Sequence, residues 1–468
     1  MEEVVYLRIP DGDNPGGSIH VTPFDRLHGF LNYRRKSLTL VWCYHAALDA
    51  EALKASLVDT LKEYPSLVGR RSLTKAAEAI ELNNAGVPFV TRMAEPATLT
   101  LTQLLDYLSP PSFREPSDAL GLRGKFVIPL THFGEGDDVP FLAVLLTQFA
   151  TGGAVLGISV DHGFCDVQST VNFMQHWALL HCGEAVNFTP HHERCVFDSI
   201  PPCSMTPTSF FCTAAGDKPE KVSKNFDAAQ VKGNPSVVLV ASFSRTSLAS
   251  LKAEASNDLP DGTFVSTDDA ITAHVWRALC RMRCTQLGIT SESQLTTTLA
   301  RACNFRSRMR PPLPDGYFGN AVTELMSHLT VQELQDLPLS HVALCLRKTM
   351  SEATHEHCVG QAHWLEARHR EGCKLGYEYP KDPNYLSFHI TSWACDFSAV
   401  NFGSPPVWFD QANAAYISAF LISDMNGGAM VHVQGPHESM EQIAGLLSLD
   451  ATSPYTSFHG CTTAAASL

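Results

Sequence analysis

The stretch from Val155 to Asp166 constrains what this chain can fold into more than any other. Its apolar residues up to Val160 follow two glycines and predict a buried strand, and the residues after Asp166 predict an amphipathic helix. His162 is therefore expected at a strand-to-helix junction, where a side chain can face a cleft while its backbone is held rigidly. Imidazole moves protons near neutral pH because its ordinary pKa is about 6.5. An equally compatible interpretation is that His162, one of 20 histidines, only ends a strand.

Composition limits the remaining possibilities. A chain of 468 residues with 44% hydrophobic and 18% charged residues predicts a globular protein of two or three domains. No apolar run reaches the roughly 18 residues of a membrane span, and the acidic start at Met1-Glu2-Glu3 lacks the features of a secretory signal. We therefore predict a cytoplasmic protein. The net charge of −14 argues against a nucleic-acid partner, because phosphate backbones require a basic surface.

None of the 14 cysteines has zinc-type spacing with a ligand partner, and the histidines lack a carboxylate-supported ligand spacing, so no metal site is predicted. Scattered cysteines in a cytosolic chain are usually buried free thiols.

The periodic segments alternate between strands and helices, which predicts an α/β protein. Between about residues 182 and 235 the periodicity stops and prolines become frequent, which indicates an extended crossing between domains. The predicted divisions are an N-terminal domain (1–185), a crossover loop (186–235) and a C-terminal domain (236–468). The strands expected before the crossing are Val4–Arg8, Ser37–Ala47, Phe126–Pro129 and Phe141–Phe149, and a helix should begin at Asp49 or Ala50 and end at Pro65.

After the crossing, helices are expected at Ser247–Ala255, Ala270–Leu287, Ser340–Glu352 and Ser439–Leu447, the second capped by Thr267-Asp268-Asp269. Strands are expected at Ser236–Phe243, Leu295–Asn304, Tyr385–Trp393, Val407–Phe409, Ala415–Ile422 and Met430–Val433. Loops are expected around Arg34-Arg35, Thr354 to His369 and Tyr377 to Tyr385.

The order of motifs over nearly the whole chain resembles the BAHD acyltransferases, which are acyl-CoA-dependent enzymes of specialised metabolism. HxxxD alone is a weak signal, but the block from Arg306 to Asn320 is long and particular. The matching segments are Val21-Thr22-Pro23-Phe24-Asp25, Leu61 to Arg70, His162 to Asp166 (HxxxD), Thr272 to Ala278 ("AHVWRA"), Asn304 to Asn320, and Thr391-Ser392-Trp393 before a degenerate DFGWG signature.

The resemblance implies a two-domain, chloramphenicol-acetyltransferase-like fold, with mixed β-sheets flanked by helices and a channel between the domains. It also implies that His162 is the general base in a ternary complex, taking a proton from the acceptor and returning one to the coenzyme A sulfur. Cys165 as an acyl-accepting nucleophile is a less favoured alternative. Asp166 is implied to be structural, paired with Arg306 or Arg308, although an orienting role in a triad stays open.

By the same resemblance, Thr391 and Trp393 face the channel near the thioester carbonyl, where a hydroxyl and an indole N–H could stabilise an oxyanion. The alternative for Trp393 is a core residue on a strand. Lys252 and Arg277 are implied to lie beside the coenzyme A nucleotide, although a solvated helix face explains Lys252 equally well. The implied co-substrate is acyl-CoA, without a permanently bound cofactor.

Two positions depart from the family pattern. Val167 follows Asp166 where the family usually has glycine, and Asn401-Phe402-Gly403-Ser404-Pro405 stands at the DFGWG position. Because the family's acid there is chiefly structural, its replacement by an amide predicts a changed contact and not the loss of catalysis.

We expect a monomeric acyltransferase that acylates a hydroxyl, less favourably an amine, of a small metabolite. A condensation-type enzyme is one alternative, although such enzymes usually carry a doubled histidine and this chain has Asp161 before His162. A non-catalytic relative that only binds ligand is the other. Neither the acyl group nor the acceptor is named by the sequence; His355, His357, His363 and Trp364 hint at a partly polar acceptor pocket.

Overall fold

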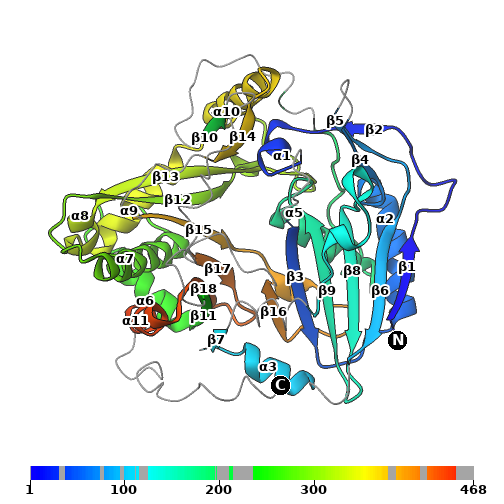
Figure 1. The fold of residues 1–468 in the computed structure, drawn as a ribbon, viewed down its shortest axis with the longest axis horizontal. Coiled ribbons are helices and arrows are strands. Elements are labelled where there is room, and N and C mark those ends of the chain that lie inside the picture. The colour runs from blue at the N-terminus through cyan, green and yellow to red at the C-terminus, as the bar shows by residue number, and fades with distance from the viewer. Residues whose placement is uncertain are drawn as a thin grey trace.

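The computed structural model describes residues 2–30, 37–73, 78–94, 100–110, 112–114, 125–194, 197, 210–213, 236–377, 386–411 and 419–448. Among these residues, two large mixed sheets stand side by side, the first built mostly from the N-terminal half and the second mostly from the C-terminal half (Figure 1). Helices pack on both sheets, which confirms the predicted α/β class.

The first sheet has β9, the strand predicted before His162, near its centre. Every residue of β9 is buried because β3 and β8 flank it antiparallel and helices cover the sheet. Within the described residues its strand order is β1 (Glu2–Leu7), β6 (Val87–Met93), β8 (Leu142–Gln148), β9 (Ala154–Asp161), β3 (Ser37–Tyr44) and β16 (Trp408–Gln411).

Helices α2 (Ala50–Glu63) and α5 (Val167–His181) cover one face of this sheet, with Leu53, Leu57 and Trp177 in its largest hydrophobic cluster. On the other face, α3 (Leu101–Leu108) joins a smaller cluster with Val155 and Phe126.

The prediction of a strand at Phe126–Pro129 was wrong. The carbonyl oxygen of Phe126 lies so close to Gly157 that a Cβ there would be 1.7 Å from it. The segment therefore packs its apolar residues on the face of β9 and forms no strand at the edge of the sheet.

Among the described residues, the helices that cover the second sheet pack on one of its faces. Its strand order is β13 (Val322–Thr330), β12 (Thr296–Asn304), β15 (Ser387–Trp393), β17 (Ala419–Ser423), β18 (Ala429–Pro436), β11 (Ser236–Phe243) and β7 (Ser112–Arg114), as far as the described ranges extend. The helices that pack with it into a second cluster are α6 (Arg245–Ala255), α7 (Thr267–Leu287), α8 (Val331–Asp336), α9 (Leu339–Ser351) and α11 (His437–Leu447).

The opposite face of the second sheet turns toward the first. Val240, Trp393, Phe420 and Ile422 belong to the same hydrophobic cluster as the α2 and α5 side of the first sheet. The sheets also exchange strands: β7, from the first half of the chain, pairs with β11, and β16, from the second half, pairs with β3. The two halves therefore share one continuous core.

Two local predictions need correction. Helix α7 begins at Thr267, and its N-cap is Ser266, whose hydroxyl accepts from the backbone of Asp269 while the Asp269 carboxylate accepts from the backbone of Ser266. The predicted loop at Thr354 to His369 is helix α10 (His355–Arg370), capped by the Thr354 hydroxyl.

The smaller elements lie around these sheets. Helix α1 (Pro23–Leu27) packs beside α10. One small sheet has the strand order β2 (Ser18–His20), β5 (Glu78–Glu81) and β4 (Arg70–Leu73). Another consists of β10 (Phe210–Thr213) and β14 (Lys374–Tyr377). The predicted loop around Arg34-Arg35 and most of the predicted crossing at 186–235 lie outside the described residues. Of the loop predicted from Tyr377 to Tyr385, Tyr377 is the last residue of β14 and the rest also lies outside them.

Candidate functional site

His162 lies immediately after β9, in the turn that leads to α5. Its ring is half-buried and lies flat against the ring of His28, with 4.6 Å between centroids and 9° between planes. Its carbonyl oxygen accepts a hydrogen bond from the Nδ2 of Asn320 at 3.0 Å. The structure thus holds the predicted base from its backbone and from one face of its ring.

Asp166 is buried and turned toward Arg306. Arg306 donates from Nη1 to Oδ2 at 2.8 Å and from Nη2 to Oδ1 at 2.9 Å, while the backbone N–H groups of Ser169 and Ala321 also donate to this carboxylate at 2.9 Å each. Burial opposes ionisation, but the Arg306 charge and these hydrogen bonds outweigh it, so the pKa of Asp166 lies below its ordinary value. The carboxylate is a fixed anion that caps α5.

The geometry distinguishes the two predicted arginines. Arg308 donates to the carbonyl oxygens of Met350 and Ala353, at 2.8 and 3.5 Å, and so Arg306 is the arginine that pairs with Asp166. Because both Asp166 oxygens accept from Arg306 and from backbone N–H groups, the geometry favours a structural role over an orienting role in a triad.

Asp25 forms a second buried ion pair beside the first. Its carboxylate accepts from Nη1 of Arg194 at 2.9 Å and from the backbone and side-chain nitrogens of Asn320 at 3.2 and 3.0 Å. Asn320 in turn reaches the carbonyl of His162. The motif resemblance marked Asp25 and Asn320, but nothing in the sequence marked Arg194 or His28 as their neighbours.

Cys165 is fully buried, and its sulfur lies 3.5 Å from the Thr170 hydroxyl oxygen. Burial is the main reason that the pKa of this thiol rises to about 12. A nucleophilic cysteine needs its thiolate, so the environment disfavours the acyl-cysteine alternative.

Thr391 and Trp393 occupy alternate positions of β15, so both side chains leave the same face of the second sheet. Both are buried, and the Trp393 ring packs edge-on against Phe420 with 5.4 Å between centroids. Trp393 belongs to the same hydrophobic cluster as Phe164, two residues after His162. This face is therefore the one that looks toward the first sheet, as the predicted role of the two residues requires.

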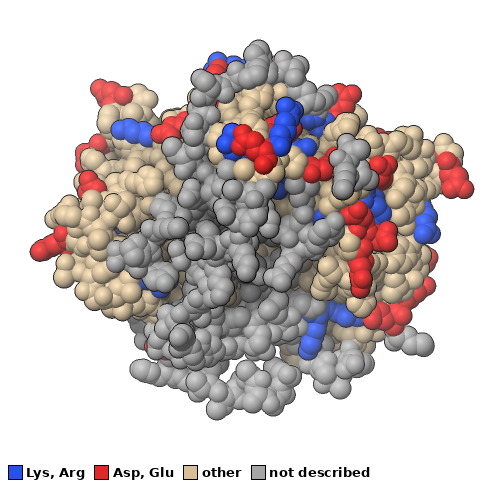
Figure 2. Space-filling model, turned by 45° about the horizontal axis from the view of Figure 1, so that its top comes forward, with Lys and Arg blue, Asp and Glu red and all other residues tan. Residues whose placement is uncertain are grey.

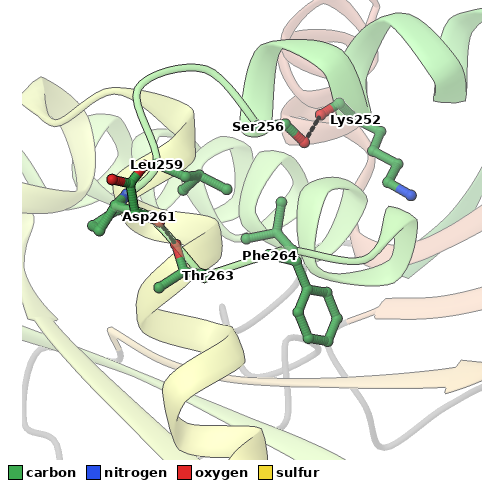
Figure 3. A pocket seen from close by; sticks show the side chains of 9 residues that line it. Lys252, Ser256, Leu259, Asp261, Thr263 and Phe264 are labelled. Atoms are coloured by element: carbon green, nitrogen blue, oxygen red, sulfur yellow. Dashed lines mark hydrogen bonds between the residues drawn. The ribbon is translucent and has the colours of Figure 1, made fainter.

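Lys252 lies on α6 and lines a pocket of about 480 Å³. Figure 3 shows its ammonium group and the Asp261 carboxylate on opposite sides of this pocket. The other lining residues are Ser256, Leu259, Pro260, Gly262, Thr263, Phe264 and Val265.

Arg277 does not line that pocket. Its guanidinium donates to the carbonyl oxygens of Leu334 and Leu337, at 2.8 and 2.6 Å, beyond the end of α8. Burial lowers its pKa from the ordinary arginine value. The structure does not bring the two predicted cations together around one cavity.

The degenerate DFGWG segment contributes one aromatic residue to the core. Phe402 is buried and packs edge-on against Trp177 at 4.8 Å between ring centroids. Asn401 is exposed, and its carbonyl oxygen lies 3.4 Å from the Cys182 sulfur. The side chain that stands at the position of the family's acid therefore lies at the surface in this chain. Val167, the other departure, begins α5 and packs against the main hydrophobic cluster.

Three histidines predicted near the acceptor lie on α10. His357 contacts Gln361 with 2.7 Å between their side-chain nitrogens, and Nδ1 of His355 accepts from the backbone of Arg310 at 3.1 Å. Within the described ranges, no group of three or more His, Cys, Asp or Glu side chains is arranged to hold a metal ion. None of the described helices combines the length and apolar character needed to cross a membrane.

Charged side chains of both signs are mixed on one face of the molecule. Figure 2 shows acidic side chains spread over the described part of one face, with basic side chains lying among them.

Comparisons with known proteins agree with this architecture. A family model described as "Transferase family" matches residues 38–448. Agmatine coumaroyltransferase-1 of Hordeum vulgare is 30% identical over 309 residues, which cover 65% of this chain and 64% of that protein. Anthranilate N-benzoyltransferase protein 2 of Dianthus caryophyllus is 26% identical over 387 residues, covering 81% of this chain and 80% of that protein.

Two solved structures show the same fold. The crystal structure of vinorine synthase covers 96% of this chain and 97% of its own, with a TM-score of 0.67 and 21% identity. The structure of F. graminearum TRI101 complexed with coenzyme A and T-2 mycotoxin covers 92% and 97%, with a TM-score of 0.69 and 16% identity.

Proposed function

Because the chain belongs to the Transferase family, the BAHD acyltransferases, we propose that it transfers an acyl group from the thioester of acyl-CoA to a hydroxyl of a small metabolite. An amine acceptor is the second candidate. Two of the relatives, agmatine coumaroyltransferase-1 and anthranilate N-benzoyltransferase protein 2, have amine acceptors in their names.

The observation that carries the proposal is the fixed position of His162. His162 lies in the turn between β9 and α5, and Phe164 of the same turn belongs to the hydrophobic cluster that reaches the second sheet. In the proposed reaction, His162 takes the proton from the acceptor hydroxyl as that oxygen attacks the thioester carbonyl carbon. The tetrahedral intermediate then collapses, the carbon–sulfur bond breaks, and the imidazolium returns the proton to the leaving thiolate.

Other described residues have supporting roles in this proposal. Trp393 and Thr391, on the face of β15 that looks toward the first sheet, are proposed as donors to the oxyanion. Asp166 holds the junction through Arg306 and does not exchange protons.

Coenzyme A brings phosphates, which an acidic protein must meet with selected cations. We assign that role to Lys252 because this residue lines a pocket large enough to admit part of a nucleotide. Arg277 is a less favoured candidate for this role, because it does not line this pocket and its donors already bind two carbonyls. The proposal includes no permanently bound cofactor. The cytoplasmic location, the monomeric state and the domain boundaries at 185 and 235 stay predictions.

The two alternatives from the sequence receive less support. Condensation-type enzymes usually carry a second histidine before the HxxxD histidine. In this chain Asp161 occupies that position and forms a buried ion pair with Arg71, with Oδ2 and Nη2 2.9 Å apart. A ligand-binding relative without catalysis would not need a half-buried histidine held at a fixed ring plane.

The test is release of free thiol from a panel of acyl-CoAs, with and without candidate hydroxyl and amine acceptors. We expect release that depends on both partners, and a fall in kcat of about 10²- to 10⁴-fold in His162→Ala. His20→Ala is the matched control because His20 is exposed on β2. Undiminished turnover in a folded His162→Ala protein would remove His162 as the base, and thiol release with no acceptor dependence would contradict the ternary mechanism.

A further inference from the structure

A second imidazole lies against the proposed base. His28 is buried at the C-terminal end of α1, and its ring covers one face of the His162 ring at 4.6 Å between centroids and 9° between planes. The two residues are far apart in the sequence, so the contact is made by the tertiary fold.

Helix α1 is bound firmly at this place. The Thr22 hydroxyl accepts from the backbone of Asp25, and the Asp25 carboxylate accepts from the backbone of Thr22, which closes a capping box. The same Asp25 binds Arg194 and Asn320, and Asn320 donates to the His162 carbonyl. Helix α1 and its C-cap residue therefore contact His162 in two ways: His28 touches the ring, and Asp25 reaches the backbone through Asn320.

Close backbone approach brings the two rings together. A Cβ added to Gly163 would lie 2.4 Å from the backbone nitrogen of Phe30 and 2.8 Å from the carbonyl carbon of Gly29. The segment after His28 thus passes directly over the residue after His162, at a distance that only a glycine permits.

The plane of the His28 ring is itself fixed. Its Nε2 lies 3.3 Å from the carbonyl oxygen of Val322, the first residue of β13. Because a carbonyl can only accept, Nε2 carries the proton in this contact. The His28 ring therefore spans from the turn of the first sheet to an edge strand of the second.

We propose that His28 is a positioning residue that holds the His162 imidazole in one plane and stabilises the imidazolium formed during acyl transfer. The inference rests on the proposed function. The χ2 torsion of histidine is broad, so the backbone alone does not fix where the ring nitrogens point. A parallel ring on one face removes that freedom, and an aromatic face attracts the positive charge that His162 acquires.

The test compares His28→Ala, which removes the ring, with His28→Phe, which keeps a flat ring but cannot donate or titrate. We expect kcat to fall by about 10- to 100-fold in His28→Ala, with KM for acyl-CoA little changed, because a misplaced catalytic group lowers kcat at unchanged binding. His28→Phe should recover most of the loss, and His20→Ala on exposed β2 should behave as wild type. A wild-type kcat in His28→Ala, or a His28→Phe protein no better than His28→Ala, would overturn the proposal.

A second measurement separates this inference from the proposed reaction. In protein labelled with ¹³C at the histidine ε1 carbon, the His162 resonance is identified by its loss in His162→Ala. The ring current of His28 should shift that resonance, so His28→Ala should move it and His28→Phe should largely restore it. A resonance unchanged in His28→Ala overturns the stack. A wild-type protein with the shift but no turnover would overturn the proposed function and leave the stacked pair established.

Discussion

At the scale of single residues, the buried ion pair of the site has a structural role that is separate from the proposed proton transfer. Asp166 and Arg306 are both buried, and they bind each other through two hydrogen bonds. A buried ion pair adds little to the stability of the fold compared with apolar residues in its place. Removing one partner is strongly destabilising, because the other charge is then buried without compensation. Asp166 therefore matters for folding even though it takes no part in the proposed proton transfer.

Asp166→Ala should lower the free energy of unfolding by roughly 3–5 kcal/mol, because it leaves Arg306 buried without its carboxylate. Urea unfolding followed by intrinsic fluorescence measures this loss. Glu371→Ala is the matched control, because the Arg368–Glu371 pair is partly exposed to solvent and its loss should matter far less. Equal destabilisation by both variants would contradict the distinction.

The same pair sets an expected pH dependence. The pKa of Asp166 is lower in the folded protein than its ordinary value of about 3.9, so its contribution is present above that value and is lost as pH falls through the folded pKa. The free energy of unfolding should therefore decrease below about pH 4, and less steeply in Asp166→Asn. Identical slopes in the two proteins would show that other carboxylates dominate acid unfolding.

Cys165 gives a prediction for the mechanism. Because burial raises the pKa of its thiol to about 12, it should carry no acyl group during turnover. Cys165→Ala should keep kcat close to wild type, and mass spectrometry of protein quenched during turnover should find no acyl adduct. An adduct on Cys165 would replace the ternary mechanism with an acyl-enzyme.

At the scale of elements, strong periodicity explains which predictions succeeded. The apolar run of β9 and the amphipathic pattern of α5 were predicted because both are buried in the expected way. Helix α10 was predicted as a loop because its histidines obscure the buried stripe of Cys358, Val359, Ala362 and Leu365. Strand β13 was missed because its buried positions include the polar residues Thr323, Glu324 and Ser327, which pair with β12.

The candidate site shows the same limit. His162, Asp166 and Arg306 belong to motifs with fixed spacing, so the sequence alone could mark them. The stack of His28 on His162 depends on the hydrogen bond between Asp25 of α1 and Asn320. This is a tertiary contact, and no spacing in the sequence predicts it.

The β9–α5 junction can be tested as an element. Gly163→Ala should destabilise the fold by about 1–3 kcal/mol and lower kcat, because the added carbon must displace the backbone at Phe30. Gly12→Ala is the control, since a Cβ there meets nothing within 4 Å. Thermal unfolding and thiol release measure the two effects, and a Gly163→Ala protein as stable and active as Gly12→Ala would mean that the close approach has no influence on the site.

At the scale of the whole molecule, the two sheets are halves of one structure. The cluster that holds Trp42 and Trp177 of the first half also holds Val240, Trp393 and Phe420 of the second. Two imidazoles, one after β9 and one touching β13, meet where those halves join. The proposed chemistry therefore depends on how the two halves are held together, as much as on the motif that carries the base.

The crossing of β7 and β16 between the sheets has a consequence for engineering new acceptor preferences. A chimaera that splices the front of this polypeptide onto the back of a homologue would give each sheet one border strand from a foreign parent. Recombination designs should instead move Ser112–Arg114 together with the later segment and Trp408–Gln411 together with the earlier one, so that each sheet keeps strands that evolved as neighbours.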